Sequence, residues 1–236
     1  MNITKESTIA KIVTDNYATS VIFQRYDIDF YCNGNRSLEQ VVDNDNLLEF
    51  LNELRLVESI KNSNEPNFNE LSLNELVDYI EKIHHSYVEQ QLLKIKQLLE
   101  KVIPKYSEKY PELIETSELL YQSSGELATH MKKEELILFP WIKKMVNTKK
   151  LGKELPVPHF KTIQNPISMM LEDHNHETNN FHTMRKLSKN YTISESVDTD
   201  FKKLYQLLDE FELDLHKHIH LENNILFPKA IELENQ

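Results

Sequence analysis

Cysteine is nearly absent from the chain, since Cys32 is the only one among 236 residues. One cysteine cannot form a disulfide within the chain or a metal site made of thiolates. Any metal must therefore be held by histidine and carboxylate side chains. Glycine and proline, which are costly inside helices, number only three and eight. With abundant Leu, Glu, Lys and Ile, this composition predicts an all-α protein.

Basic clusters and long apolar runs are also missing. The formal net charge is −11, and no block of five or six basic residues occurs, which argues against nucleic-acid binding. No stretch approaches the roughly 18 apolar residues of a membrane span, and the first residues, MNITKESTIAKIV, lack the apolar run of a signal peptide. We expect no membrane contact and a cytoplasmic location.

A polar stretch, NSNEPNFN, has no apolar period and contains Pro66. Such a stretch is typical of a domain boundary. We therefore predict a small helical N-terminal domain over residues 1–62, a linker over 63–70, and a second domain over 71–236.

Within the small domain, the segment DIDFYCNGNRSLEQ predicts a tight turn. Asn33, Gly34 and Asn35 are residue types that supply the positive φ angles such turns require. Ser37 can then cap the helix that follows.

Four long helical patterns follow residue 71, which suggests a four-helix bundle. Ser72 and Glu75 form a capping box at the start of the first, and Asn165 is expected to cap the third, with Pro166 in its first turn. The longest loop is expected over 147–164. The expected helices run from Ser72 to near Pro104, from about 107 to 145, from Asn165 to about Leu187, and from about Ser194 to Ile231.

Two segments 88 residues apart share six residues at the same offsets: HMKKEELILFP (130–140) and HIHLENNILFP (218–228). In each, a histidine and a glutamate stand four apart, so on an α-helix their side chains leave from one face. A single pair of this kind is commonly a solvated surface pair. The repetition instead indicates two ligand pairs, His130 with Glu134 and His218 with Glu222, because a cation offsets the cost of burying both groups.

Two further histidines could complete the set. The first helix offers His84 or His85, which periodicity does not separate, and the third offers His174. Four histidines and two glutamates suit two metal ions that share both carboxylates, which makes Glu134 and Glu222 the candidate bridges. These ligand types fit iron, manganese or zinc, and iron is the preferred choice for a paired site.

The remaining polar residues near the motifs have simpler interpretations. His216 and His220 stand four apart on another helix face, where a surface zinc site is conceivable but a solvated or supporting role is expected, as for His176. His159 and His182 are ordinary polar residues. Glu135, Glu172 and Asp173 could relay protons or form charged helix surface, whereas Phe139, Trp141 and Phe227 are expected in the core.

These motifs together resemble the hemerythrin-like iron–sulfur cluster repair proteins, the repair-of-iron-centres family. The resemblance covers nearly the whole chain and includes the DIDFYCNGNRSLE, HMKKEE, MMLEDH and HLENNILFP segments, in family order. It implies a hemerythrin-like up-down bundle behind the small domain. It also implies a di-iron centre with the glutamates bridging and with His85, rather than His84, as a ligand; the set is His85, His130, Glu134, His174, His218 and Glu222.

The resemblance also implies an activity: repair of iron–sulfur clusters damaged by nitric oxide or peroxide, by donation of iron to the damaged proteins. Two alternatives use the same ligands. One is an oxygen or nitric oxide binding or sensing module, and the other is an enzyme that reduces nitric oxide or peroxide. The attached N-terminal domain favours repair, because a gas carrier needs only the bundle. The sequence leaves a homodimer open.

The N-terminal motif departs from the family at one point. The family carries two adjacent cysteines followed by two glycines, where this chain has Tyr31, Cys32, Asn33 and Gly34. Cys32 could still bind iron or react as a thiol, but it cannot form a local dithiol switch. A small residue in a turn is an equally good interpretation.

Overall fold

A computed structural model describes residues 3–58, 66–193 and 196–236 of the chain. Those residues form helices joined by turns, with no strand among them beyond one isolated bridge between Thr8 and Ser37. The predicted all-α class is confirmed. Over the same residues, no helix combines the length and apolar character that crossing a membrane would require.

The chain divides into two compact units. One contains residues 1–76 together with 219–236, and the other contains residues 77–218. The expected division into 1–62, a linker over 63–70 and 71–236 stays a prediction, and residues 59–65 lie outside the described part of the chain.

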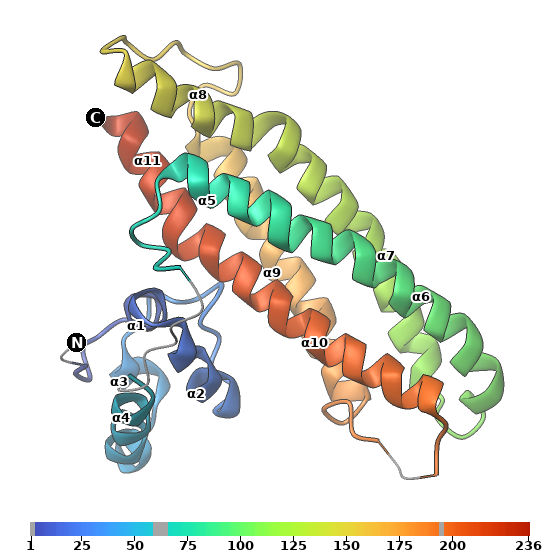
Figure 1. Ribbon diagram of the computed structural model, residues 1–236. Helices are drawn as coiled ribbons and strands as arrows, with labels where there is room; N and C mark the ends of the chain where they lie inside the picture. Colours follow the sequence, from blue (N-terminus) through green and yellow to red (C-terminus); the bar gives the residue numbers. More distant parts are fainter. Residues whose placement is uncertain (1–2, 59–65, 194–195) are drawn as a thin grey trace. The chain divides into compact units, whose positions relative to one another are not determined.

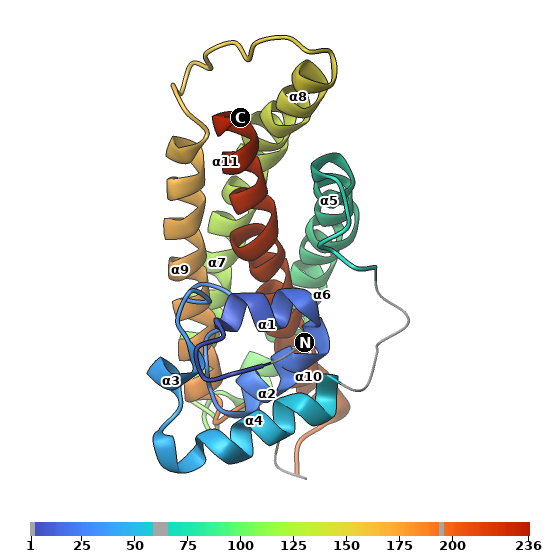
Figure 2. The same cartoon turned by 90° about the vertical axis from the view of Figure 1, so that its left-hand side faces the viewer.

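Residues 77–218 form an up-down bundle of four helical rods, whose alternating directions can be followed in Figures 1 and 2. Two of the rods contain a π-helical segment within this unit. In chain order the elements of the four rods are α5 (Leu73–Tyr79), η2 (Ile80–His85) and α6 (Ser86–Tyr106); α7 (Glu112–Lys133), η3 (Glu134–Leu138) and α8 (Phe139–Lys150); α9 (Gln164–Leu187); and α10 (Thr199–Leu221).

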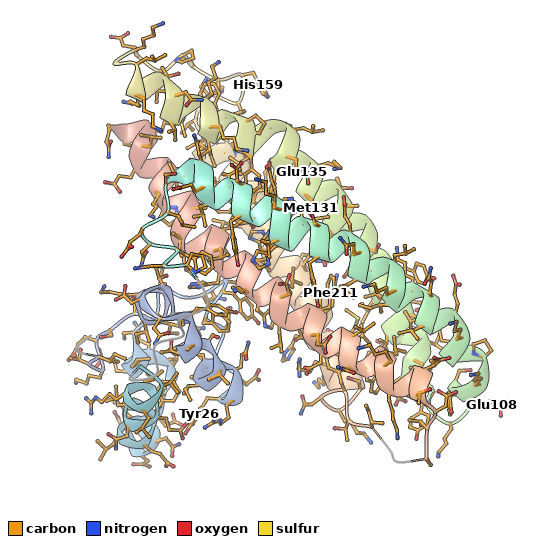
Figure 3. The ribbon with its side chains drawn as sticks, in the orientation of Figure 1. Tyr26, Glu108, Met131, Glu135, His159 and Phe211 are labelled. Carbon is orange, nitrogen blue, oxygen red and sulfur yellow. The ribbon has the colours of Figure 1, made fainter. Side chains whose placement is uncertain are left out.

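The bundle is packed by apolar residues at helical spacing. Leu92, Ile95, Leu99 and Val102 line one face of α6 and are buried. Met131 of the second rod and Phe211 of the fourth rod, both labelled in Figure 3, are buried as well. Burial of these faces gives most of the helical stability in a bundle.

Of the two helix caps predicted in the bundle, one is confirmed and the other is wrong. The Ser72 N–H donates to Glu75 Oε2 at 2.9 Å and the Glu75 N–H donates to Ser72 Oγ at 3.3 Å, which confirms the capping box. The predicted cap at Asn165 is wrong, because α9 already begins at Gln164 and the Asn165 side chain donates to the Phe160 carbonyl instead.

Two other starts differ from expectation. The second rod begins at Glu112 rather than near residue 107, since Pro111 fits just before the first helical residue. The expected start of the fourth rod, Ser194, lies outside the described residues; α10 begins at Thr199, where the Asp198 carboxylate accepts the Phe201 N–H at 3.0 Å.

The other unit contains short helices and the C-terminal continuation of the fourth rod. Its apolar core includes Ile9, Phe23, Phe30 and Phe50, which are fully buried. The elements are α1 (Ile9–Asp15), η1 (Tyr17–Thr19), α2 (Ser20–Arg25), α3 (Leu38–Val41), α4 (Asn44–Glu58), η4 (Glu222–Leu226) and α11 (Phe227–Asn235).

The turn before α3 differs from its prediction. Asn33, Gly34 and Asn35 do not have positive φ; within the predicted segment only Asp27, with φ of 53°, has left-handed backbone. Gly34 is instead required by close approach: an added Cβ would lie 2.8 Å from the Ala10 Cβ. Ser37 caps α3 as predicted, directly before the first helical residue, and its N–H donates to Gln40 Oε1 at 2.8 Å.

Candidate metal centre

Five of the six predicted ligands lie in the bundle unit, and each of its four rods supplies at least one. His85 ends η2, His130 lies in α7, His174 in α9 and His218 in α10, while Glu134 begins η3. All five side chains are at most 3% exposed. Burial of so many ionisable groups is costly without a partner that offsets it.

The imidazole nitrogens converge on one carboxylate. His85 Nε2 lies 3.3 Å from Glu134 Oε2, and His130 Nε2 lies 3.5 Å from Glu134 Oε1. His174 Nε2 lies 3.1 Å from His130 Nε2. Ligand atoms of His85, Glu134 and His218 lie within 4.8 Å of one another, as do those of His130, Glu134 and His174. Glu134 therefore belongs to two adjacent groups of nitrogen and oxygen donors.

Carboxylates outside this group orient two of the rings. Glu135 Oε1 lies 2.9 Å from His85 Nδ1, and Asp173 Oδ2 lies 3.2 Å from His130 Nδ1. Because a carboxylate accepts hydrogen bonds, each Nδ1 carries the ring proton and each Nε2 keeps a lone pair for a cation. The Nε2 lone pairs of His85 and His130 face the lone pairs of the Glu134 carboxylate. Such lone pairs repel each other unless a cation lies between them, so these residues fit a metal.

The supporting carboxylates are themselves held in their charged form. Hydrogen bonds from His130 and then Lys133 hold the pKa of Asp173 well below its usual range. For Glu135, burial raises the pKa, but hydrogen bonds from Lys132 and His85 outweigh burial, and the net shift is downward. Two of the residues named as proton relays or surface charge thus contact the rings of predicted ligands, whereas Glu172 is exposed.

Adjacent histidines on the first rod are both buried, at 1% for His84 and 2% for His85. Their helix is π-helical over Ile80–His85, and the wider turn lets two consecutive side chains face inward. His85 is the one whose Nε2 lies beside Glu134. His84 Nδ1 instead lies 3.0 Å from Asp214 Oδ1.

The sixth predicted ligand, Glu222, lies on the direct continuation of α10, four residues after His218. It is fully buried and begins the π-helical segment η4, as Glu134 begins η3. In both segments the Phe N–H that follows bonds to the carbonyl of that glutamate, five residues back. The next residue, Pro140 or Pro228, lacks an N–H and disfavours regular α-helix, which accounts for a π segment in each copy of the repeat.

Several other predictions can be compared with the structure. Of the two roles expected for His216 and His220, the solvated one is wrong, because both are buried, at 7% and 1% exposed, and the supporting one stays a prediction. Desolvation, with Arg185 and His182 nearby, lowers the pKa of His216 to about 3. His176 is exposed and lies 3.2 Å from Glu126 Oε2.

His159 and His182 are exposed, as ordinary polar residues should be. Phe139 and Phe227 lie in the core as predicted, whereas Trp141 is only half-buried, between Phe160 and Lys144.

Cys32 lies in the unit that contains the N-terminal helices and is half-buried. Its N–H donates to Asp29 Oδ1 at 2.8 Å, which fixes the turn. In the same unit, Asn223 and Asn224 donate to the carbonyls of Tyr31 and Phe30 at 3.1 and 3.0 Å. The residues that directly follow Glu222 thus hold the backbone beside Cys32.

A cavity of about 400 Å³ is lined in part by His130. Glu126, Asp173, His176 and Glu177 are among its lining residues. Glu177 is 2% exposed, and burial raises its pKa to about 8. Glu177 and Asp214 were not predicted from the sequence, although each stands about one helical turn from a predicted ligand, His174 or His218, and this spacing is the available signal.

Comparison with known proteins agrees with this arrangement. Residues 82–230 match the hemerythrin HHE cation binding domain, and residues 5–57 match a domain of unknown function, DUF542 (ScdA_N). The iron-sulfur cluster repair protein ScdA of Staphylococcus haemolyticus is 30% identical over 96% of this chain and 99% of its own.

Two other relatives carry similar names. The probable iron-sulfur cluster repair protein of Haemophilus influenzae is 32% identical over 89% of this chain and 90% of its own. The iron-sulfur cluster repair protein YtfE of Escherichia coli O81 is 29% identical over 90% of both chains. With matched domains in family order and buried donors on every rod of the bundle, the chain belongs to the hemerythrin-like family of iron–sulfur cluster repair proteins.

Proposed function

We propose that this protein binds two iron ions and donates iron to iron–sulfur proteins whose clusters have been damaged by nitrosative or oxidative stress. The observation that carries the proposal is the convergence of His85 and His130 on the two oxygens of Glu134. One carboxylate with a nitrogen donor at each oxygen suits two cations side by side. The names of the relatives supply the client class.

The proposed ligand set adds His174, His218 and Glu222 to these three residues. Glu222 is buried and stands one turn after His218 on a continuous helix, as Glu134 stands one turn after His130. Two bridging carboxylates would offset the repulsion between two divalent cations. When bound, the iron pair would supply the ions that are donated.

The protein's own residues explain how iron could be both held and released. Glu135 and Asp173 fix the ring orientation of His85 and His130, and such supporting carboxylates typically change metal affinity 10–100-fold. A purely histidine and carboxylate set binds Fe²⁺ without the tight thiolate bonds of a structural site. This suits a protein that gives its iron away. The expected cytoplasmic location stays a prediction.

The direct test is transfer from protein loaded with ⁵⁷Fe under anaerobic conditions to a cluster-depleted acceptor protein. The proposal predicts faster cluster recovery than with the same amount of free ferrous salt. A His130→Ala variant should lose the advantage, while an exposed-site variant, His182→Ala, should keep it. Recovery no faster than with ferrous salt would contradict iron donation.

The two alternative functions are distinguished by other readouts on the same samples. Stoichiometric, reversible uptake of oxygen or nitric oxide without iron transfer would support a binding or sensing module. Multiple-turnover loss of nitric oxide with a supplied reductant would support a reductase. Deleting the N-terminal domain is a poor discriminator, because Asn223 and Asn224, next to Glu222, would lose their backbone partners. Cys32→Ser in the full chain is the cleaner variant.

A further inference from the structure

His84 is a buried histidine that the proposed ligand set does not use. It is 1% exposed, and its Nδ1 lies 3.0 and 3.1 Å from the two carboxylate oxygens of Asp214. Because a carboxylate only accepts hydrogen bonds, Nδ1 carries the ring proton and Nε2 carries a lone pair. Nε2 is buried and has no hydrogen-bond partner among the described residues. Such an atom is costly to bury unless it has a ligand.

The surroundings of His84 repeat those of two proposed ligands. His85 and His130 also have Nδ1 beside a carboxylate, Glu135 and Asp173 respectively. This arrangement fixes the tautomer and raises the basicity of Nε2 in metal-binding histidines. His84 nevertheless belongs to neither group of donors that lie within 4.8 Å of one another. His84 therefore has the features of a cation ligand but lies outside the proposed ligand set.

His84 lies next to the resident set. Its ring is stacked on that of His218, with the ring centroids 5.5 Å apart and the planes 8° from parallel. His85, the following residue, contacts His218 at 5.0 Å between ring centroids. The π-helical segment that ends at His85 brings both neighbours inward. An ion that leaves His218 would thus have the His84 imidazole as a neighbouring ligand, since the two ring centroids lie 5.5 Å apart.

We propose that His84 is a transfer ligand, whose Nε2 binds Fe²⁺ as the ion enters or leaves the centre at His218. In this exchange one iron–nitrogen bond forms at His84 while one breaks at His218. The oxidation state of the ion does not change, and no proton is released, because Nε2 carries none. The inference rests on the proposed function, since donation from a buried centre requires stepwise ligand exchange.

The test measures iron release from the full chain to an excess of a ferrous chelator in a stopped-flow instrument. His84→Phe keeps a flat ring against His218 but has no lone pair. We expect it to hold two irons with an unchanged Mössbauer spectrum, and to release and take up iron at least 10-fold more slowly. His182→Phe, at an exposed histidine, is the matched control and should exchange iron at the wild-type rate.

Asp214→Asn provides a second variant that keeps the histidine. The asparagine amide can accept from Nδ1 or donate to it, so the ring proton is no longer held at Nδ1 and a fraction of the molecules carry it on Nε2, where it blocks the lone pair. Release should be slower than in the wild type but faster than in His84→Phe, and this variant provides the test if His84→Phe does not fold.

Wild-type release rates in both variants would overturn the proposal and leave His84 as a packing residue. Loss of one iron at equilibrium from His84→Phe would overturn it in favour of a resident ligand. Failure of the wild type to pass iron to a cluster-depleted acceptor, with the rate difference intact, would count against the proposed function alone.

Discussion

The two copies of the repeat, 130–140 and 218–228, share their candidate metal ligands and differ in what surrounds these residues. Each contains a histidine, a glutamate one turn later, a π-helical segment and a Phe-Pro pair. The residue after the glutamate is Glu135 in the first copy, where it supports the ring of His85. In the second copy it is Asn223, which donates to the Tyr31 carbonyl.

Burial separates the copies in the same way. Ile137 is 41% exposed, whereas Ile225, at the same offset, is 2% exposed. Leu136 is 72% exposed, whereas its counterpart Asn224 donates to the Phe30 carbonyl. The candidate ligand positions are the same in both copies, and the positions between them differ with their neighbours.

The largest effect is expected at the shared glutamates. Glu134→Gln and Glu222→Gln should each weaken binding of at least one iron by about 100-fold or more, since a neutral amide cannot offset the repulsion between two cations. Iron per chain after gel filtration measures the loss, with Glu172→Gln as the exposed control. If one variant loses iron and the other keeps both ions, the copies are not equivalent in function.

The difference in burial between the two copies should appear in the free energy of unfolding. Ile225→Ala is expected to lower the free energy of unfolding of the metal-free protein by about 2–4 kcal/mol, as truncation of a buried isoleucine does. Ile137→Ala, the matched variant in the other copy, should cost less than about 1 kcal/mol because Ile137 is already 41% exposed in the folded protein. Chemical denaturation measures both, and equal costs would contradict the difference in burial.

The residues after the two glutamates should separate metal binding from stability. Glu135→Gln is expected to reduce iron affinity by about 10-fold or more, because it leaves the His85 ring less firmly oriented. Asn223→Ala should instead reduce stability by about 1 kcal/mol through the lost hydrogen bond, with a smaller loss of iron affinity than in Glu135→Gln. An iron titration and a thermal melt on each variant test this prediction. A larger loss of affinity in Asn223→Ala than in Glu135→Gln would contradict it.

The smallest effect concerns pH and the helix that packs on the first copy. Burial raises the pKa of Glu177 to about 8, while the unfolded value is about 4.3. The folded state therefore binds the extra proton between these values, and stability declines as pH rises from about 4 to 8. Glu177→Gln should stabilise metal-free protein by about 1–2 kcal/mol at pH 8 and by little at pH 4. A pH-independent effect in denaturation curves would contradict the assigned burial cost.

Sequence patterns predict the features that depend on spacing along one helix. The repeat and the Ser72–Glu75 capping box are local, so the order of the residues is enough to identify them. The family resemblance also selects His85, whose Nε2 lies beside Glu134.

Features that depend on contacts between helices could not be predicted. The π-helical turn that buries His84 with His85, and the pairing of His84 with Asp214, 130 residues away, leave no signal in apolar periodicity. The solvated interpretation of His216 is wrong for the same reason, because a histidine on the second face of a helix can be buried by a neighbouring helix.

One set of histidines and glutamates is proposed to hold two irons, and ⁵⁷Fe Mössbauer spectroscopy on protein titrated anaerobically with iron decides whether it does. We predict two irons per chain with the spectrum of an exchange-coupled pair after oxidation, and loss of that spectrum in both His130→Ala and His218→Ala. A single uncoupled iron in the wild type, or a coupled pair that survives both substitutions, would contradict it.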